Sequence, residues 1–370
     1  MKNNESSNKS SFGRIFTRSV MLVINVIIIA LMLLSVMANY LSPAKYSTLF
    51  AFLALLFPLW VMLNIICVSL WMIARRWYFL LSLAAMLISL PSIKNTFSFH
   101  SELPLWPADE NRLTLMTYNV AAFDKYDKHT PTLEYIRRQN ADVVCLQEFA
   151  VSDRNDYITQ SEVLKTLSAY PYHYFTFTVE RSGRHFGIAT FSKYPIVDAD
   201  RLEIPSMGNA VHYCDILIGT DTLRVVNCHL ESFSFSANDL NSLDQAHTNP
   251  NSESFRQAGK TMLTRMAPRF RTRAKQADII AASLAGRMTK TIVCGDFNDT
   301  PVSYTYHTIR GDRLDAHVEA EWGPGYTYYH RGMGVRIDQI LHSRDLHLVD
   351  FRTLRSGASD HYPLRATLSW

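Results

Sequence analysis

The sequence predicts a layered α/β domain, with two sheets packed face to face and helices outside, preceded by a membrane segment. Three observations predict it. The long apolar runs of this 370-residue chain that lack acidic residues fall within its first hundred residues. Short strand-like runs recur after Arg112, and several are apolar almost throughout, as in strands buried on both faces. Helical periods lie between some of these runs without a clean βαβ repeat, so two layered sheets fit the mixture.

Three apolar runs predict three transmembrane helices. Val20–Leu41 is uncharged over about 22 residues, near the length that crosses a bilayer. Ser47–Ile73 is also uncharged, and the shorter Trp77–Ile93 opens with two aromatic residues typical of a membrane interface. Two alternatives stay open. The first run could be a cleavable signal peptide, since Val36-Met37-Ala38 resembles a cleavage site, and the third could be a helix lying in the interface.

Basic residues predict the orientation of this segment. Four of them precede the first run, Arg75-Arg76 follow the second, and Lys45 alone lies between. By the positive-inside rule the N-terminus is cytoplasmic, and three crossings place the domain outside the cytoplasm, whereas two would leave it inside. In a bacterium this describes a multi-pass protein of the inner (cytoplasmic) membrane. The predicted regions are a basic cytoplasmic tail (1–19), a membrane region (20–94), a linker (95–112) and a domain (113–370).

Strands and helices of the domain follow from the same patterns. A polar segment, Ser232–Ser254, is expected to be a surface loop. The predicted helices are Thr132–Gln139, Ser161–Ser168 and Phe270–Leu284. The predicted strands are Leu113–Val120, Val143–Leu146, Tyr172–Val179, Gly187–Phe191, Val211–Ile218, Leu223–Cys228, Thr291–Cys294, Ile337–Leu341 and Leu364–Leu368.

The charge of the domain argues against a general DNA-binding protein. The whole chain has a formal net charge of +4 and residues 1–94 carry +7, so residues 95–370 carry −3. A slightly acidic domain lacks the electrostatic signature of DNA binding, although local patches matter more than totals. Six basic residues could form a DNA-facing strip, but such residues more often form a solvated helix face. They are Lys260, Arg265, Arg269, Arg271, Arg273 and Lys275.

Polar residues stand at the ends of six apolar runs, and two of these clusters give the clearest signal. In Cys294–Asp299, which reads C-G-D-F-N-D, Asp296 and Asn298 are two residues apart and share one side of a strand end. Ser359-Asp360-His361 adds a carboxylate and an imidazole. A carboxylate with a carboxamide can hold a hard cation or a water, so the two motifs indicate metal-assisted chemistry on a phosphate ester.

Three of the other four clusters allow two interpretations each. Asn119 could donate to a phosphate oxygen or occupy a turn. Glu148 follows an apolar run, where a cation would remove the cost of an unpaired carboxylate, but it could equally lie on the surface. His229 could protonate a leaving oxygen or be a hydrogen-bonded structural histidine, and Glu231 beside it is interpreted as structural. Asp338 interrupts an apolar run, which is the position expected of a carboxylate that orients an imidazole.

The order of these clusters resembles the endonuclease/exonuclease/phosphatase superfamily. The motifs are T-Y-N, L-Q-E, N-C-H-L, G-D-F-N-D, I-D-Q-I and S-D-H-Y-P, and they cover roughly Leu113 to Leu368. That superfamily includes DNase I-like nucleases, abasic-site endonucleases, inositol polyphosphate 5-phosphatases and neutral sphingomyelinases. The resemblance implies a four-layered α/β sandwich (DNase I-like) and a Mg²⁺-dependent attack of water on phosphorus, with Mn²⁺ also possible.

The resemblance also implies roles for individual residues. Glu148 is the principal metal ligand, Asn119 helps at the metal and the phosphate, and Asp360 lies at or near the metal. Mg²⁺ keeps several waters, so one or two carboxylates suffice. The implied catalytic residues follow: Asp296 holds or deprotonates the attacking water, Asn298 orients the substrate and Asp296, His229 and His361 flank the phosphate, and Asp338 orients His361. Which residue is the base, and whether one or two metals act, stays open.

The sequence therefore predicts a membrane-anchored, divalent-metal-dependent phosphoesterase that hydrolyses a phosphodiester or phosphomonoester. An endonuclease or exonuclease acting on DNA is the alternative within this class. A non-catalytic membrane-anchored binding protein is a more distant alternative. The expected partners are a phosphate-ester substrate, with nucleic acid as one candidate, and the lipid bilayer, without an obligate protein partner. Tethering and the acidic domain favour a phospholipid-like or other small phosphodiester.

Overall fold

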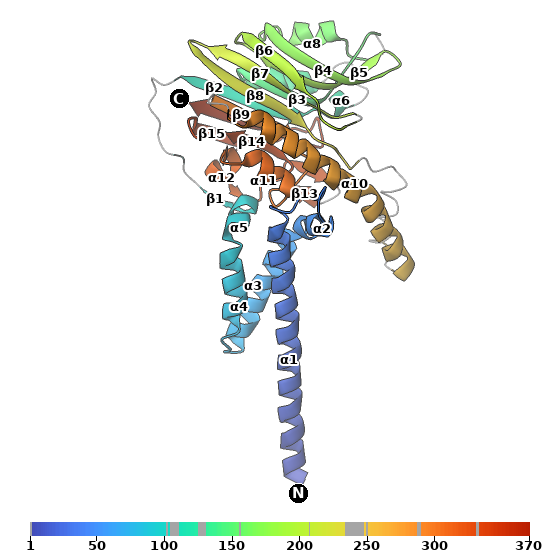
Figure 1. The fold of residues 1–370 in the computed structure, drawn as a ribbon, viewed down its shortest axis with the longest axis vertical. Coiled ribbons are helices and arrows are strands. Elements are labelled where there is room, and N and C mark those ends of the chain that lie inside the picture. The colour runs from blue at the N-terminus through green and yellow to red at the C-terminus, as the bar shows by residue number, and fades with distance from the viewer. Residues whose placement is uncertain are drawn as a thin grey trace.

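A stalk of helices carries a domain of two β-sheets at one end (Figure 1). The computed structural model describes residues 2–100, 103, 111–124, 131–154, 157–206, 208–233, 248, 251–286, 290–330 and 333–370. The helices of the stalk are α1 (Lys2–Met37), α2 (Leu49–Leu55), α3 (Phe57–Ile73), α4 (Phe79–Ile88) and α5 (Leu90–Thr96).

One stalk helix is by itself long and apolar enough to cross a membrane. It is Phe16–Met37 of α1, a helix of 22 residues whose most apolar 18-residue stretch has a mean hydropathy of 3.0. The pairs α2–α3 and α4–α5 meet the same criterion only when each is taken as one span, and they are bent by 64° and 69°. Pro58 and Pro91 stand in the first turn of α3 and α5, where proline can begin a helix but cannot continue the preceding one. The first predicted span is thus supported, whereas the other two runs are broken helices.

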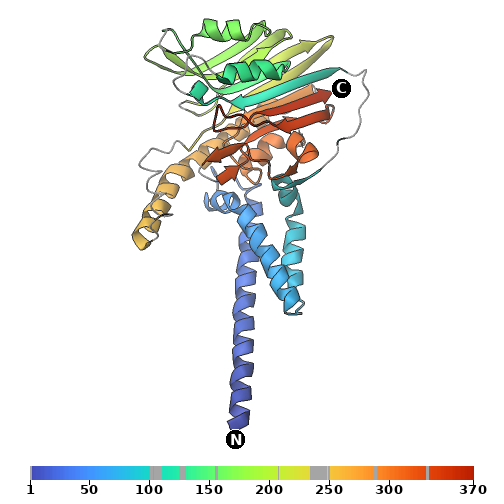
Figure 2. The same cartoon turned by 180° about the vertical axis from the view of Figure 1, so that it is seen from behind.

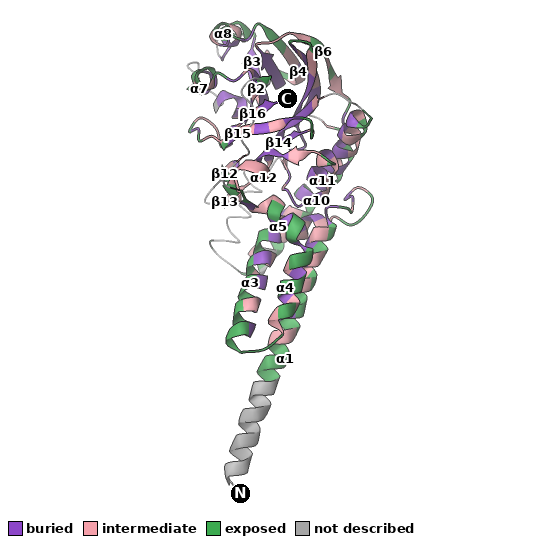
Figure 3. Cartoon of the chain, turned by 90° about the vertical axis from the view of Figure 1, so that its left-hand side faces the viewer, coloured by how far each residue is buried: buried purple, intermediate pink, exposed green. Residues whose placement is uncertain are grey.

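Buried polar side chains join the stalk helices. Asn25 Oδ1 accepts hydrogen bonds from Trp71 Nε1 at 3.1 Å and Ser82 Oγ at 3.2 Å, and so links α1 to α3 and α4. The outward faces of the same helices are exposed (Figure 3), and they carry apolar side chains such as Ile27 and Met72, which are 52% and 58% accessible. Polar groups turned inward and apolar side chains turned outward are the arrangement that a lipid environment favours.

Two six-stranded mixed sheets form the body of the domain. Within them β2 pairs in parallel with β3, and β8 with β9, while the other neighbours are antiparallel. The first sheet has the order β15 (His347–Thr353), β16 (Leu364–Ser369), β2 (Arg112–Asn119), β3 (Val143–Ser152), β5 (Arg184–Ser192), β4 (Tyr172–Arg181). The second has the order β10 (Leu314–Asp315), β14 (Asp338–His342), β9 (Lys290–Asp296), β8 (Asp221–His229), β7 (Ala210–Ile218), β6 (Ile196–Leu202).

Strand alternation builds a core on both sides of each sheet. In β2, Leu113 and Leu115 pack between the sheets, whereas Met116 and Tyr118 face the outer helices. In β9, Ile292 and Cys294 belong to the same inter-sheet core. Burial on both faces explains why these strands are apolar almost throughout. The sequence patterns predict the edge strand β4 but miss the edge strands β6 and β15, whose polar residues interrupt the apolar signal.

Helices cover both outer faces, which completes four layers. The first sheet is covered by α7 (Pro131–Gln139) and α8 (Gln160–Thr166), the teal and green helices of Figure 2. The second is covered by α10 (Ser252–Leu284) and α11 (Tyr304–Arg310), in front in Figure 1. The predicted layered α/β fold is therefore confirmed. The predicted loop Ser232–Ser254 lies mostly outside the described residues, and from Ser252 its chain belongs to α10.

The domain sits directly on the stalk. Val302 packs into the stalk core beside Met32, Ala54 and Phe57. The rings of Phe52 in α2 and Phe270 in α10 meet edge to face, with centroids 5.2 Å apart. The remaining short elements are α6 (Ala121–Asp124), α12 (Ala316–Ala320), β1 (Ser98–Phe99), β11 (Trp322–Gly323), β12 (Tyr328–His330) and β13 (Met333–Val335).

A buried histidine links the two sheets and should make the fold sensitive to acid. His212 of β7 is hydrogen-bonded at 2.8 Å to both Thr176 and Thr190 of the opposite sheet, and burial lowers its pKa to about 3. Below the unfolded-state pKa of about 6.5, His212 binds a proton in the unfolded chain but not in the folded one. Stability should therefore fall as the pH drops from about 6.5 toward 3, by about 1.4 kcal/mol per pH unit.

Urea unfolding of the full-length protein in detergent between pH 6.5 and 5 tests this expectation. His212→Gln keeps hydrogen-bonding groups but does not titrate, so its unfolding free energy should fall less steeply than that of the wild type. Equal slopes for the two proteins would contradict the assignment.

Candidate active site

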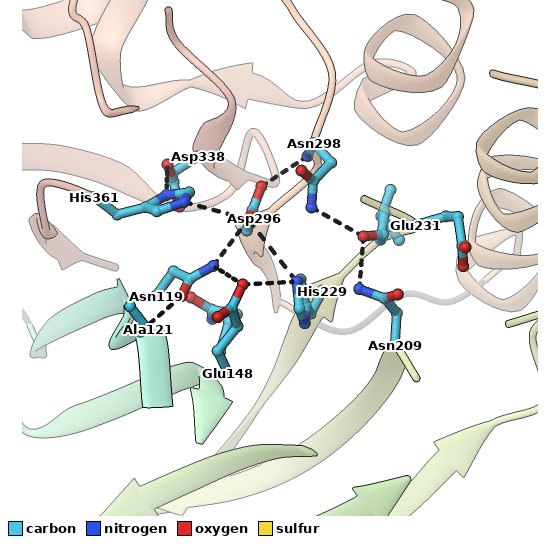
Figure 4. A network of polar contacts seen from close by, with 12 residues as sticks. Asn119, Ala121, Glu148, Asn209, His229, Glu231, Asp296, Asn298, Asp338 and His361 are labelled. Carbon is cyan, nitrogen blue, oxygen red and sulfur yellow. Dashed lines mark hydrogen bonds and ion pairs between the residues drawn. The ribbon is translucent and has the colours of Figure 1, made fainter. Parts of the chain in front are cut away.

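The predicted site residues converge where strands of both sheets end (Figure 4). His229 ends β8, Asp296 ends β9 and Asp338 begins β14, and the register pairs Asp296 with both of the others. Strand alternation then decides which way they face. Asp296 continues the inward series of Ile292 and Cys294, so its side chain enters the space between the sheets.

Strand alternation brings Asn119 into the same space, but it does not account for the position of Glu148. Asn119 shares the parity of Leu113 and Leu115 in β2. In β3 the inward position after Cys145 is Gln147, so regular alternation would turn Glu148 outward. A register shift between Leu146 and Phe149, with Glu148 at φ 48°, interrupts that alternation. This bulge turns the Glu148 carboxylate toward the other site residues (Figure 4).

A steric constraint explains why the G-D-x-N motif begins with glycine. Gly295 has φ +124°, and a Cβ at this position would lie 2.0 Å from the carbonyl oxygen of Cys228 on the neighbouring strand. Only glycine permits so close an approach of β8 and β9 just before Asp296. Asn298, at φ 51°, then turns the chain back. Its backbone N–H donates to Asp296 Oδ1 at 2.8 Å, and its side chain donates to Leu230 O at 3.0 Å.

Asn119 holds the two carboxylates of the site together. Its Nδ2 donates to Asp296 Oδ2 at 3.0 Å and to Glu148 Oε1 at 3.3 Å. Its Oδ1 accepts from the backbone N–H of Ala121 at 3.1 Å, which fixes the direction of the amide. Asp296 is 1% exposed. Its burial and the charge of Asp338 raise its pKa to about 6, against the opposing effect of His361, His229 and the Asn298 N–H.

His361 forms an ion pair with Asp338. Its Nδ1 lies 2.9 Å from Asp338 Oδ2, so Nε2 is presented to the site, 3.9 Å from Asp296 Oδ2. Burial lowers the pKa of His361, but the charge and hydrogen bond of Asp338, with the charges of Asp296 and Asp360, outweigh it and raise the pKa to about 10. The imidazole is therefore protonated at neutral pH and can face a developing negative charge.

His229 carries a buried nitrogen without a hydrogen-bond partner among the described residues. This Nε2 lies 3.9 Å from Glu148 Oε1 and 3.9 Å from Asp296 Oδ2. A buried polar atom of this kind calls for a ligand, an ion or a water. Figure 4 shows the imidazole directed toward the two carboxylates, where a phosphate group could meet it.

Two groups of residues could hold a cation, and the chemistry favours one. Ligand atoms of Asp296, Asp338 and His361 lie within 4.8 Å of one another. However, Asp338 already binds His361, and a protonated imidazole repels a cation. The Glu148 carboxylate is 41% accessible and adjoins Asp296 through Asn119, which provides the oxygen atoms that Mg²⁺ prefers. The residues present therefore fit a divalent ion on the Glu148 side.

Asp360, also a predicted metal ligand, is not among the three residues whose ligand atoms lie within 4.8 Å of one another. Its side chain is exposed, and its hydrogen-bond partner in the described chain is Ser359 at 3.4 Å. It acts on the site through its charge, which raises the pKa of His361. Glu231, interpreted as structural, pairs with Arg269 and accepts from Ser206 Oγ at 2.7 Å.

The sequence patterns do not single out Tyr328, Thr327 or the pair Gln147–Asn227. The ring of Tyr328 lies 4.9 Å from that of His361, and Thr327 Oγ1 accepts from Asp338 N at 3.0 Å. Gln147 Nε2 donates to Asn227 Oδ1 at 2.7 Å across the two sheets, directly beneath the site. Gln147 and Asn227 lie in the L-Q-E and N-C-H-L motifs, so their place beside Glu148 and His229 could have revealed them.

The class of protein follows from comparison with known families. Residues 116–361, about two thirds of the chain, match the Endonuclease/Exonuclease/phosphatase family, so the chain belongs to that family. Residues 18–96 match a domain of unknown function (DUF8431). No curated protein sequence matches the chain.

The chain is similar to solved structures at low sequence identity, and the first of them supports the same fold. An endonuclease/exonuclease/phosphatase from Beutenbergia cavernae is 16% identical, with a TM-score of 0.50 over 70% of this chain and 71% of the other. Truncated Caenorhabditis elegans TDP2 is 19% identical, with a TM-score of 0.47 over 70% and 98% of the two chains. Sphingomyelinase C from Streptomyces griseocarneus is 17% identical, with a TM-score of 0.41 over 70% and 99%.

Asp338→Asn should release His361 from its ion pair. Without the charge of Asp338, burial favours the neutral imidazole, so the pKa of His361 should fall from about 10 toward or below its usual range. NMR titration of the full-length protein with ¹³C-labelled histidine measures this shift. Asp350→Asn, on the remote edge strand β15, serves as the control. A pKa of His361 that is the same in Asp338→Asn and wild type would refute the pairing.

Proposed function

We propose that this protein is a membrane-anchored phosphoesterase that uses a divalent metal, Mg²⁺ or Mn²⁺, to hydrolyse a phosphodiester or phosphomonoester. The observation that carries the proposal is the convergence of two groups on one space. Glu148 and Asp296, joined by Asn119, stand on one side, and the His361–Asp338 ion pair stands on the other. Membership of the Endonuclease/Exonuclease/phosphatase family supports the same chemistry.

Each residue has a role that its surroundings support. The pKa of Asp296, near 6, suits a carboxylate that accepts a proton from water at neutral pH. Protonated His361, held by Asp338, faces the charge that develops on the phosphate oxygens. Nε2 of His229, which has no hydrogen-bond partner in the described part of the chain, could donate to a phosphate or leaving oxygen. A divalent ion held by Glu148, with help from Asn119, would act as a Lewis acid that offsets the charge of the substrate.

The proposed topology has three membrane spans and an extracytoplasmic domain. The Arg18 side chain contacts the Tyr78 hydroxyl, so the basic start of α1 lies level with the Arg75-Arg76 loop. The domain packs against the opposite end of the stalk. About 19 residues of helix between Arg18 and Met37 span about 29 Å, close to the thickness of the bilayer core. The positive-inside rule then makes the arginine end cytoplasmic, as in a bacterial inner-membrane protein.

The nuclease alternative loses part of its support. Arg273 is fully buried and donates to Asp299 Oδ2 at 3.2 Å and to Glu231 O at 2.7 Å. Arg269 pairs with Glu231. Two of the six basic residues that could form a DNA-facing strip therefore hold the loops of the site in place, and are not available to a DNA backbone.

Metal dependence is the first test. Full-length protein in nanodiscs should hydrolyse bis(p-nitrophenyl) phosphate with Mg²⁺, lose the activity on treatment with a chelator, and regain it on adding Mg²⁺ back. The reason is that the substrate anion must approach the carboxylates of Glu148 and Asp296. Hydrolysis at equal rates before and after chelation would remove the metal from the proposal.

Replacement of the central residues is the second test. Asp296→Ala and His361→Ala should each lower kcat by at least about a hundredfold, the usual contribution of acid–base groups. The remote replacements Asp350→Ala and His347→Ala on β15 are controls and should keep wild-type rates. Unfolding curves show whether each variant is folded. A folded Asp296→Ala or His361→Ala protein with near-normal turnover would show that the residue is not catalytic.

A further inference from the structure

A cavity of about 400 Å³ lies between the stalk and the domain. The stalk contributes Ala54–Leu59, around the bend between α2 and α3, together with Phe97 after α5. The domain contributes Pro301 and Val302, Tyr326, and Gly334 and Val335 of β13. Figure 1 shows β13 next to α2 at the top of α1. The volume falls within the range of small-molecule sites, roughly 300–1,000 Å³.

The lining is suited to a hydrocarbon chain. Most of the residues around the cavity are apolar, and among the described ones Arg336 is the single charged residue. Its Nη1 is engaged with Asp315 Oδ2 at 2.9 Å and Gln339 Oε1 at 3.1 Å and its Nη2 with the carbonyl of Asn95, while its Nε has no partner among the described residues. The charge of Arg336 is therefore paired with that of Asp315, and burial of apolar surface favours the entry of an apolar group.

The position of the cavity points to a lipid. Leu56, between α2 and α3, and Leu59, in the first turn of α3, are 46% and 38% exposed, and they continue the apolar outer surface of the stalk. Exposed aromatic side chains surround this level of the molecule. Tyr326 is 47% exposed and lines the cavity, and Trp322 is 71% exposed beside Phe99. Tyrosine and tryptophan at such a level are typical of a bilayer interface.

The segments that line the cavity also carry the active site. Thr300 lies two residues after Asn298, and Arg336 two residues before Asp338. The backbone joins these two segments, since Phe297 N donates to Ile337 O at 2.9 Å. Tyr326 precedes Thr327, whose hydroxyl accepts from Asp338 N at 3.0 Å. A chain in the cavity would therefore end beside the loops that hold Asp296 and Asp338.

We propose that this cavity binds the hydrocarbon chain of a phosphate-bearing lipid, whose headgroup reaches the active site. The inference rests on the proposed phosphoesterase function and names its substrate class, a lipid phosphate ester drawn from the bilayer that surrounds the stalk. The domain then works at the membrane surface without releasing its substrate into water.

Alkyl phosphates of different length test the cavity. Butyl, octyl and dodecyl phosphate are compared as inhibitors of bis(p-nitrophenyl) phosphate hydrolysis by the full-length protein in nanodiscs. Direct binding of dodecyl phosphate is measured by calorimetry, with protein-free nanodiscs subtracted. Affinity should rise with chain length, by up to about fourfold per buried methylene. Inorganic phosphate, without a chain, gives the baseline for the headgroup.

Variants from the two walls of the cavity separate chain binding from partition into the lipid. Leu59→Trp on α3 and Val335→Trp on β13 fill the cavity and should each weaken dodecyl phosphate at least tenfold. Hydrolysis of bis(p-nitrophenyl) phosphate and inhibition by inorganic phosphate should not change. The matched controls are Leu87→Trp and Val197→Trp, exposed at 61% and 55% away from the cavity, and they should bind as the wild type does.

The outcomes distinguish this inference from the proposed function. The lipid site is refuted if the affinity of the wild type for alkyl phosphates depends on chain length no more than binding to protein-free nanodiscs does. It is also refuted if both folded cavity variants keep the wild-type dependence on chain length. Either result holds even when hydrolysis is present. If dodecyl phosphate binding depends on the cavity but no phosphate ester is hydrolysed, the lipid site stands and the proposed enzyme activity fails.

Discussion

The buried carboxylate of Asp296 is the constraint on which the site depends. A carboxylate that is 1% exposed is costly unless its surroundings satisfy it. Its surroundings are the Asn119 amide, the Asn298 N–H and two imidazoles, at 3.0, 2.8 and 3.9 Å. These groups come from both sheets and from the loop after β9. Stabilisation of the Asp296 carboxylate therefore requires both sheets to pack in register, which links the geometry of the candidate site to the fold.

Much of the site could be predicted because strand ends leave a signal in sequence. Asp296, His229 and Asn119 each follow a run of buried alternating residues, and that alternation carries them inward. Glu148 does not follow this alternation. Alternation directs Gln147 inward and would turn Glu148 outward. The bulge that reorients Glu148 depends on pairing with β5, and local sequence does not encode it. The family resemblance, and not strand alternation, implied the role of Glu148 as a metal ligand. Arg273 was predicted to lie on the surface but is buried, because its burial depends on tertiary contacts that local sequence does not show.

Arg273 connects the stalk to the active site. Its guanidinium lies over the rings of Phe233 and Phe270, at 4.4 and 5.0 Å from their centroids, and donates to Asp299. Phe270 in turn meets Phe52 of α2. The loop from Asp296 to Val302 is thus held from two directions, by α10 at Asp299 and by the stalk core at Val302. The stalk therefore contributes directly to the position of the loop that carries Asp296 and Asn298.

The charges of the site give an independent reason for a cation. Asp338 and protonated His361 offset each other, which leaves Glu148 and Asp296 facing the substrate with one shared amide donor. A phosphate ester is itself anionic, and at a separation of about 4 Å two like charges repel by about 4 kcal/mol near a protein surface. His229 and His361 together do not remove this excess when Asp296 is ionised. A divalent ion between Glu148 and the phosphate would reverse the sign of the local field, so the charges of the site support the proposed use of a metal.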